Sequence, residues 1–89
     1  MGLTKTHSKE YGGDGIRVNS VMPGAIATER QIKEVLTPEY RAWCMQQQSI
    51  KRDLLPKEVA NVILFLASDD SSAVTGSSYV VDGGFVSDP

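Results

Sequence analysis

Two short β-branched segments separated by one strongly apolar helix place the tightest constraint on how this chain can fold. Residues 16–22 form the first segment, which stops at a Pro-Gly pair, and residues 78–82 form the second, which stops at Gly-Gly. Over residues 56–67, apolar side chains recur at helical spacing. Two strands joined through a helical crossover form a right-handed βαβ unit with parallel strands. The sequence therefore predicts an α/β fold built on a parallel strand pair.

Further helices are predicted from their end signals. Residues 2–11 are expected to form a helix that the glycines after it close, because glycine adopts the left-handed conformation found at helix ends. Thr37 is a plausible cap for a helix over residues 38–48, since proline suits the first turn that follows it. Leu55 is a poor cap for the helix at residue 56. The helix-prone residues before Thr37 allow a fourth helix.

The composition excludes several classes of partner. A net charge of −2 provides no basic surface for nucleic acid or acidic lipid. No apolar run reaches the roughly 18 residues of a membrane span, so no membrane partner is expected. Cys44 is the only cysteine, which rules out an internal disulfide and favours a cytoplasmic location. His7 is the only histidine, so neither a zinc site nor a Ser-His-Asp triad is expected.

Short motifs follow one another along nearly the whole chain. They are, in order, Gly2-Leu-Thr-Lys5, Gly15-Ile-Arg-Val-Asn19, Pro23-Gly24 with Thr28 following, Pro56-Lys-Glu-Val-Ala60, Leu64-Phe-Leu-Ala-Ser-Asp69, Thr75-Gly76 and Val81-Asp-Gly-Gly84. Each motif alone is common. Their order and spacing together resemble the C-terminal portion of the short-chain dehydrogenase/reductase family.

This resemblance implies a Rossmann-type, doubly wound parallel sheet, of which the chain would hold only the C-terminal βαβ part. We therefore expect an incomplete fold with two strands and three to four helices. Residues 1–89 would form a partial domain, truncated at the N-terminus. The resemblance also implies hydride transfer between NAD or NADP and a carbinol or carbonyl. The residue that selects between the two cofactors would fall upstream, so both stay open.

The resemblance assigns cofactor contacts to the segment that follows residue 22. Pro23 and Gly24 would begin a loop that passes under the nicotinamide, the Ile26 backbone would meet the carboxamide, and the Thr28 hydroxyl would bond to it. A primary amide needs both a donor and an acceptor, which a main-chain group and a hydroxyl supply. The alternative is that Pro-Gly is simply a turn and that Thr28 caps a helix.

Residues 29–50 correspond to the substrate-capping region of the family. Within it, Thr28-Glu-Arg-Gln31, Leu36-Thr-Pro38 and Gln46-Gln-Gln48 resemble bacterial aldose 1-dehydrogenases, which implies a sugar substrate such as xylose or arabinose. Aromatic and sulfur side chains would contact the sugar ring or the nicotinamide, and the glutamines would bond to hydroxyls; the contact candidates are Tyr40, Trp43, Met45, Gln46, Gln47 and Gln48. Equally, these side chains would pack the helix onto the body or face water.

The catalytic residues of the family are absent from this sequence. Proton transfer requires a tyrosine with a lysine four residues later, yet the residues four positions after the three tyrosines are Gly15, Cys44 and Gly83. The glycine cluster at residues 12–15 follows a helix and precedes a strand, whereas a phosphate-binding loop needs the reverse order. We assign no catalytic residue and no metal ligand, and expect no activity from this chain alone.

An interaction module is the alternative hypothesis. The resemblance implies that residues 56–67 and 78–82 pack against the same elements of a neighbouring subunit, as part of a homo-oligomer. The apolar strand over residues 16–22 would also expose one unpaired edge, which favours partner binding or aggregation. A truncated reading frame without a cellular product is a third alternative.

Overall fold

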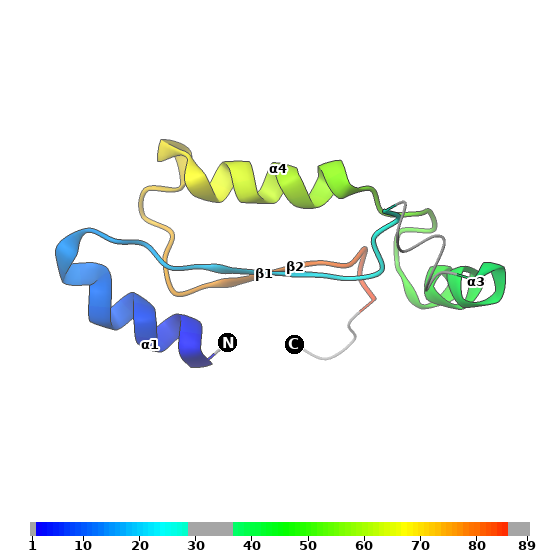
Figure 1. The fold of residues 1–89 in the computed structure, drawn as a ribbon, viewed down its shortest axis with the longest axis horizontal. Coiled ribbons are helices and arrows are strands. Elements are labelled where there is room, and N and C mark those ends of the chain that lie inside the picture. The colour runs from blue at the N-terminus through cyan, green and yellow to red at the C-terminus, as the bar shows by residue number, and fades with distance from the viewer. Residues whose placement is uncertain (1, 29–36, 86–89) are drawn as a thin grey trace.

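A pair of parallel strands forms the centre of the molecule, with helices on both sides (Figure 1). The computed structural model describes residues 2–28 and 37–85. Strand β1 (Ser20–Pro23) pairs with β2 (Ser78–Val81) in parallel, with Val21 opposite Tyr79. Helix α4 (Pro56–Ala67) lies on one side of the strands and α1 (Gly2–Tyr11) on the other. The predicted α/β fold, with a parallel βαβ unit, is confirmed.

The remaining elements connect these layers. The 3-10 turn η1 (Gly12–Asp14) follows α1, and η2 (Asp69–Ser71) follows α4. Helix α3 (Pro38–Gln47) stands beyond the carboxyl ends of the strands, at the right of Figure 1. The Thr37 hydroxyl accepts a hydrogen bond from the Tyr40 amide at 3.2 Å, which confirms the predicted cap.

The first strand begins later than its sequence predicts. Residues 16–19 form no regular strand, and several of their hydrogen bonds to the segment before β2 involve side chains. The Val18 amide donates to the Thr75 hydroxyl at 3.0 Å, and the Val18 carbonyl accepts from the Gly76 amide at 2.8 Å. The Asn19 side-chain amide donates to the Val74 carbonyl at 2.8 Å. Regular pairing therefore starts only at Ser20.

Arg17 ties the end of the α4 crossover to the start of the strand. Its guanidinium donates to the Ser71 hydroxyl at 3.0 Å and to the carbonyls of Val74 and Ser68 at 3.3 and 3.4 Å. Ser71 is fully buried, and its hydroxyl in turn donates to the Leu66 carbonyl at 2.9 Å. A polar network thus holds the return from α4 to β2 against β1.

An acidic side chain, rather than residue 55, caps α4. The Glu58 carboxylate accepts a hydrogen bond from the Leu55 amide at 2.8 Å. A residue within the helix thus satisfies a backbone N–H at the helix start that has no backbone partner. The Arg52 guanidinium donates two hydrogen bonds to the same carboxylate, of 2.9 and 2.5 Å. The Arg52 guanidinium and the Leu55 amide together lower the pKa of Glu58 from 4.5 to about 2.

The apolar core of the described residues is small. It comprises Ile26 and Leu54, which form a β-bridge beyond the end of β1, and Cys44 of α3. Several large apolar side chains are at least half exposed, including Ile63 at 51% and Leu64 at 66%. The radius of gyration is 15.4 Å, against roughly 12 Å for a compact domain of this length. Both observations fit the incomplete sheet that was expected.

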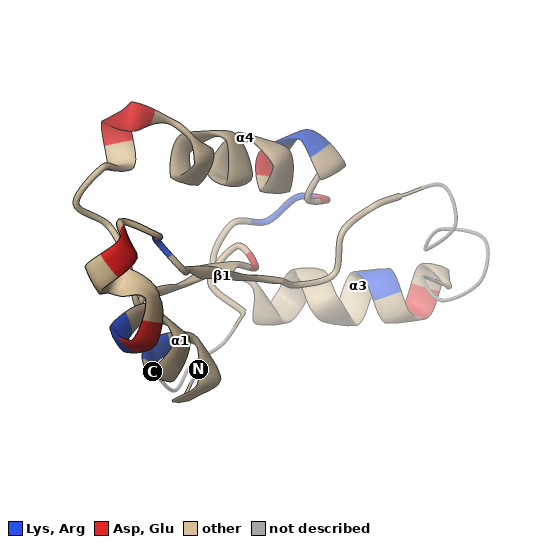
Figure 2. Ribbon diagram, turned by 60° about the vertical axis from the view of Figure 1, so that its left-hand side comes forward, with Lys and Arg blue, Asp and Glu red and all other residues tan. Residues whose placement is uncertain are grey.

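The charges avoid the body of α4. Figure 2 shows charged residues at its first turn and in the acidic turn η2 after it, with an uncharged stretch between. The sequence from residue 59 to residue 68 carries no charge. Within the part of the chain that the structure describes, no helix is both long and apolar enough to span a membrane.

We predict that Glu58→Gln destabilises the fold in a pH-dependent way. Because folding lowers the pKa of Glu58, its stabilising contribution is complete above pH 4.5 and is lost as the pH falls toward 2. The melting temperature of the variant should lie below that of the parent at neutral pH, and the gap should close in acid. Circular dichroism melts across this range measure it. Glu10→Gln, at the exposed end of α1, is the control; an equal effect of both variants would contradict the cap assignment.

Candidate functional site

All four residues assigned to cofactor contact line one groove. Pro23, Gly24, Ile26 and Thr28 form one wall of a groove of about 430 Å³, which lies where β1 ends. The opposite wall belongs to α4 and consists of Pro56, Val59, Ala60 and Ile63. Open parallel sheets bind ligands at the carboxyl ends of their strands, and this groove occupies that position.

Gly24 begins the groove because no side chain fits there. Its amide donates to the Val81 carbonyl at 2.9 Å and so extends the strand pairing by one residue. A Cβ atom placed at Gly24 would lie 2.7 Å from the Cβ of Asp82, which is closer than carbon atoms approach. The ends of the two strands are therefore in direct backbone contact, and only glycine permits it.

The loop after Gly24 is fastened to the segment between α3 and α4. Ile26 forms a parallel β-bridge with Leu54, and the Ala27 amide donates to the Leu54 carbonyl at 2.7 Å. The Thr28 amide turns back to the Ile26 carbonyl at 2.8 Å. These bonds hold a backbone turn at the groove, with the Thr28 side chain half-buried beside it. The helix that Thr28 would alternatively cap falls in residues 29–36, outside the described residues.

The chemistry of the groove suits a flat, uncharged ring that carries an amide. Its walls are mainly apolar, and the Thr28 hydroxyl can donate or accept at one end. No lysine or arginine is among the described residues that line it, so these residues offer no countercharge to a phosphate. They fit the nicotinamide end of a dinucleotide better than its pyrophosphate.

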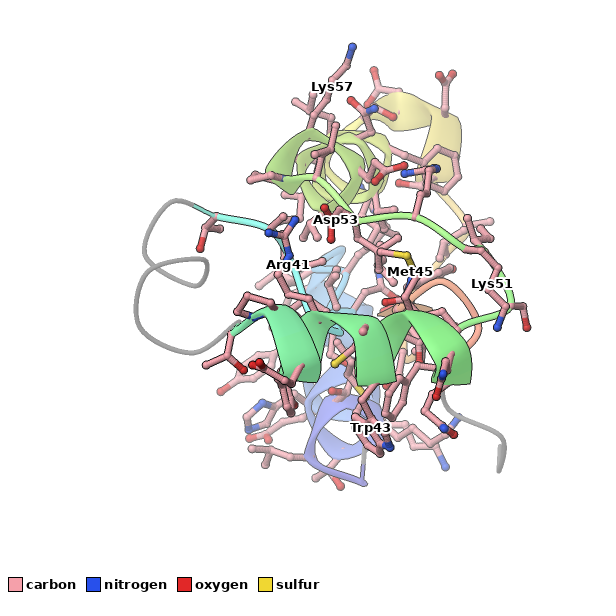
Figure 3. All side chains as sticks on the ribbon, turned by 90° about the vertical axis from the view of Figure 1, so that its right-hand side faces the viewer. Arg41, Trp43, Met45, Lys51, Asp53 and Lys57 are labelled. Atoms are coloured by element: carbon pink, nitrogen blue, oxygen red, sulfur yellow. The ribbon has the colours of Figure 1, made fainter. Side chains whose placement is uncertain are left out.

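The residues of α3 divide between two faces. Arg41, Cys44 and Met45 of α3, with Gln48 directly after it, line a small recess against the body. Arg41 forms an ion pair with Asp53, toward which it points in Figure 3. Figure 3 also shows Trp43 pointing to the opposite side of the helix. The sequence alone left open whether these side chains face a ligand or pack on the body, and the structure separates them.

Gln48 belongs to the packed face. It is 4% exposed, and its side-chain amide donates to the carbonyls of Ile50 and Arg52 at 2.9 and 3.0 Å. These bonds turn the chain at the end of α3, so the structure shows the packing alternative for Gln48, one of the two that the sequence left open. Gln46 and Gln47, by contrast, are exposed.

Sequence reasoning missed the α4 wall of the groove and the place of Asp82 behind Gly24. The position of Asp82 behind Gly24 could have been predicted from the strand register. Pro23 pairs with Val81, so the next positions of two parallel strands are Gly24 and Asp82. Asp82 is 7% exposed, and its carboxylate accepts from the Gly84 amide at 2.9 Å. No cluster of three metal-binding side chains occurs among the described residues.

Comparison with known proteins identifies the family. The family model described as enoyl-(acyl carrier protein) reductase, a short-chain dehydrogenase model, matches residues 1–86. The chain is 44% identical to D-xylose 1-dehydrogenase of Caulobacter vibrioides over 94% of its own length and 34% of that protein. It is 48% identical to a 3-oxoacyl-(acyl-carrier-protein) reductase of Thermotoga maritima over 97% of its length and 34% of that protein.

A solved structure agrees with these matches. A 3-oxoacyl-(acyl-carrier protein) reductase from Brucella melitensis, solved with bound NAD, superposes with a TM-score of 0.83 at 39% identity, over 97% of this chain and 30% of that one. The chain belongs to the short-chain dehydrogenase/reductase family, as its motifs indicated. It spans about a third of the length of the curated relatives it matches.

We predict that Gly24→Ala destabilises the fold by about 1–3 kcal/mol, the usual range for overpacking. The added methyl group would meet the Asp82 Cβ and push the strand ends apart. Urea unfolding followed by circular dichroism measures the loss. Gly13→Ala is the matched control, because a Cβ there meets no atom within 4 Å. Equal stability of the two variants would be incompatible with the close approach of the strands.

Proposed function

We propose that this chain forms the nicotinamide-side wall of an NAD(P)-dependent oxidoreductase that transfers hydride between the cofactor and a carbinol or carbonyl, and that it does not catalyse this reaction alone. The observation that carries the proposal is the convergence of Pro23, Gly24, Ile26 and Thr28 on one groove at the carboxyl end of β1. Its mainly apolar walls and the Thr28 hydroxyl suit an amide-bearing ring.

The residues of this chain would bind the nicotinamide and orient it. The Thr28 hydroxyl would hydrogen-bond to the carboxamide, and the backbone near Ile26 would complete the donor and acceptor pair that an amide requires. Pro23 and Gly24 would exclude water from one ring face. When bound, the nicotinamide supplies a carbon that accepts or releases hydride. The chain has no Tyr-x-x-x-Lys pair with which to move the accompanying proton.

An aldose is the proposed substrate class, with residues 29–50 as the segment that covers it. The motifs of that segment and the match to a sugar dehydrogenase support this choice. Because an acyl-carrier-protein reductase matches equally well, the substrate requires a direct test. Dependence on NAD(P) and the single free cysteine, Cys44, favour a cytoplasmic location.

We predict that the 89-residue chain transfers saturation to the nicotinamide protons of NADH in saturation-transfer-difference NMR, but much less to the adenine protons. The described residues that line the groove suit the nicotinamide end and include no cation that would hold the phosphates. Thr28→Val, which removes the hydroxyl at almost constant volume, should weaken the nicotinamide signal several-fold. Thr6→Val is the control, since its hydroxyl only bonds to the Gly2 carbonyl on α1. Equal nicotinamide signals from both variants would refute the role of Thr28.

The lack of independent activity is tested separately. The purified chain, mixed with NAD or NADP and D-xylose, should produce no increase in the near-ultraviolet absorbance of reduced nicotinamide. The missing proton-transfer pair is the reason for this expectation. Turnover in protein free of host enzymes would overturn it.

Association with a subunit of the same family is the second candidate function. The specific observation in its favour is the uncharged body of α4, where Leu64 is 66% and Phe65 44% exposed; Val80 of β2 is also 44% exposed. Apolar side chains that gather on an uncharged helix favour contact with protein rather than with water. Residues 56–67 and 78–82 would form this contact, as in a homo-oligomer.

We predict that Leu64→Lys lowers the self-association of the chain, measured by sedimentation velocity over a range of concentrations. A charge in a buried apolar contact carries a desolvation cost, whereas the same charge on a free surface does not. Leu3→Lys is the matched control, because Leu3 is 67% exposed on α1. A concentration-independent monomer in the parent chain would argue against the assembly function.

A further inference from the structure

A buried side-chain amide shapes the loop that follows α3. Gln48 is 4% exposed, and its amide nitrogen donates to the carbonyls of Ile50 and Arg52 at 2.9 and 3.0 Å. The backbone amides of Ser49 and Ile50 donate to the Gly83 carbonyl, at 2.8 and 2.9 Å. A Cβ atom at Gly83 would lie 3.3 Å from the Gln48 amide nitrogen, so Gly83 packs against this side chain. Gln48 therefore closes the loop over residues 49–52 and holds it against the turn after β2.

The same loop leads to the backbone that supports the groove. Leu54 is 3% exposed and lies two residues beyond the second carbonyl that Gln48 binds. It forms the β-bridge with Ile26, and its carbonyl accepts a hydrogen bond from the Ala27 amide at 2.7 Å. The Thr28 amide donates to the Ile26 carbonyl at 2.8 Å. A short path of backbone and hydrogen bonds thus connects the Gln48 side chain to Thr28.

Gln48 is better placed to fix this loop than the ion pair beside it. The side chains of that pair, Arg41 and Asp53, are 33% and 36% exposed, and an ion pair in contact with water adds little to stability. The Gln48 amide is shielded from water, so solvent does not compete for its two hydrogen bonds. A side-chain NH₂ group also has two donors at a fixed angle, and each carbonyl accepts one of them.

We propose that Gln48 is a positioning residue for the groove, because its amide fixes the loop that leads to Leu54 and so determines where Thr28 lies. Gln48 is not among the described residues that line the groove, so it acts through the backbone and not by contact with a ligand. The proposal rests on the proposed function for the nicotinamide that Thr28 would meet. The placement of Thr28 itself can be measured without any ligand.

The first test needs no cofactor and uses the full chain. Gln48→Met keeps the length of the side chain and removes both donors. It should shift the Ala27 and Thr28 signals in a ¹H–¹⁵N spectrum and speed hydrogen exchange of the Ala27 amide by about 2- to 10-fold, the range for loss of one hydrogen bond. The amides of α4 should exchange as in the parent chain, since the effect is local.

Two further variants accompany this test. Gln47→Met makes the same change at the preceding, exposed residue of α3 and should leave the Ala27 and Thr28 signals unchanged. Gln48→Asn keeps an amide that is one methylene too short to reach both carbonyls. It repeats the test in a milder form if circular dichroism shows that Gln48→Met does not fold.

The second test asks whether Gln48 acts through Thr28. Gln48→Met should weaken the saturation-transfer signal of the nicotinamide protons of NADH by about 2- to 10-fold, as expected when the Thr28 hydrogen bond is misplaced. A variant that combines Gln48→Met with Thr28→Val should lose less than the product of the two single losses. Residues that act in one path are not additive, whereas independent losses of structure multiply.

Three results would overturn the positioning role. They are unchanged Ala27 and Thr28 signals in a folded Gln48→Met variant, equally faster exchange across the whole chain, and a nicotinamide signal that Thr28→Val weakens but Gln48→Met does not. A different result would count against the proposed function alone. If Thr28→Val leaves the nicotinamide signal unchanged while Gln48→Met still moves the Thr28 amide, the placement of Thr28 by Gln48 stands and the nicotinamide contact fails.

Discussion

The parallel register between β1 and β2 is the constraint on which the other features depend. It is set outside the strands themselves, by Asn19 and Thr75, whose side chains bond across to the neighbouring backbone before regular pairing begins. From that start, four residue pairs bring Gly24 opposite Asp82. A shift by one residue would move every side chain of the strand to the other face and place a Cβ where the backbones meet.

Polar bonds fix the relative positions of the segments of this chain more than its small core does. Three apolar residues are buried among those described, whereas Arg17, Ser71, Gln48 and Glu58 each link two segments through several hydrogen bonds. Backbone and side-chain bonds specify geometry well but add little net free energy in contact with water. These bonds fix the positions of the residues around the groove, while much of the apolar surface of α4 stays exposed.

The sequence predicted the parts of the fold that depend on local signals. The α4 stripe, the Thr37 cap and the Gly-Gly strand end each follow from neighbouring residues, and their combination sufficed for the βαβ unit. The late start of β1 did not follow, because Thr75 competes for its backbone from 57 residues away. The Glu58 cap was missed for a related reason, since the acidic residue acts inside a helix whose preceding residue, Leu55, carries no polar group. To predict which face of α3 packs against the body, one would need to know the path of residues 48–54.

The crossover between the strands has a consequence for how this region can vary. Ser20 and Ser78, whose hydroxyls lie 2.7 Å apart, are separated by 58 positions, and α3 lies within the loop that their pairing closes. The entropy of closing a flexible loop grows only with the logarithm of its length, so that doubling the loop adds about 0.6 kcal/mol. Insertions or deletions before α3 would therefore scarcely change the free energy of forming the sheet. The connection that contains α3 is therefore the part of this architecture whose length can change at the lowest free-energy cost, while the paired strand ends tolerate not even a methyl group at Gly24.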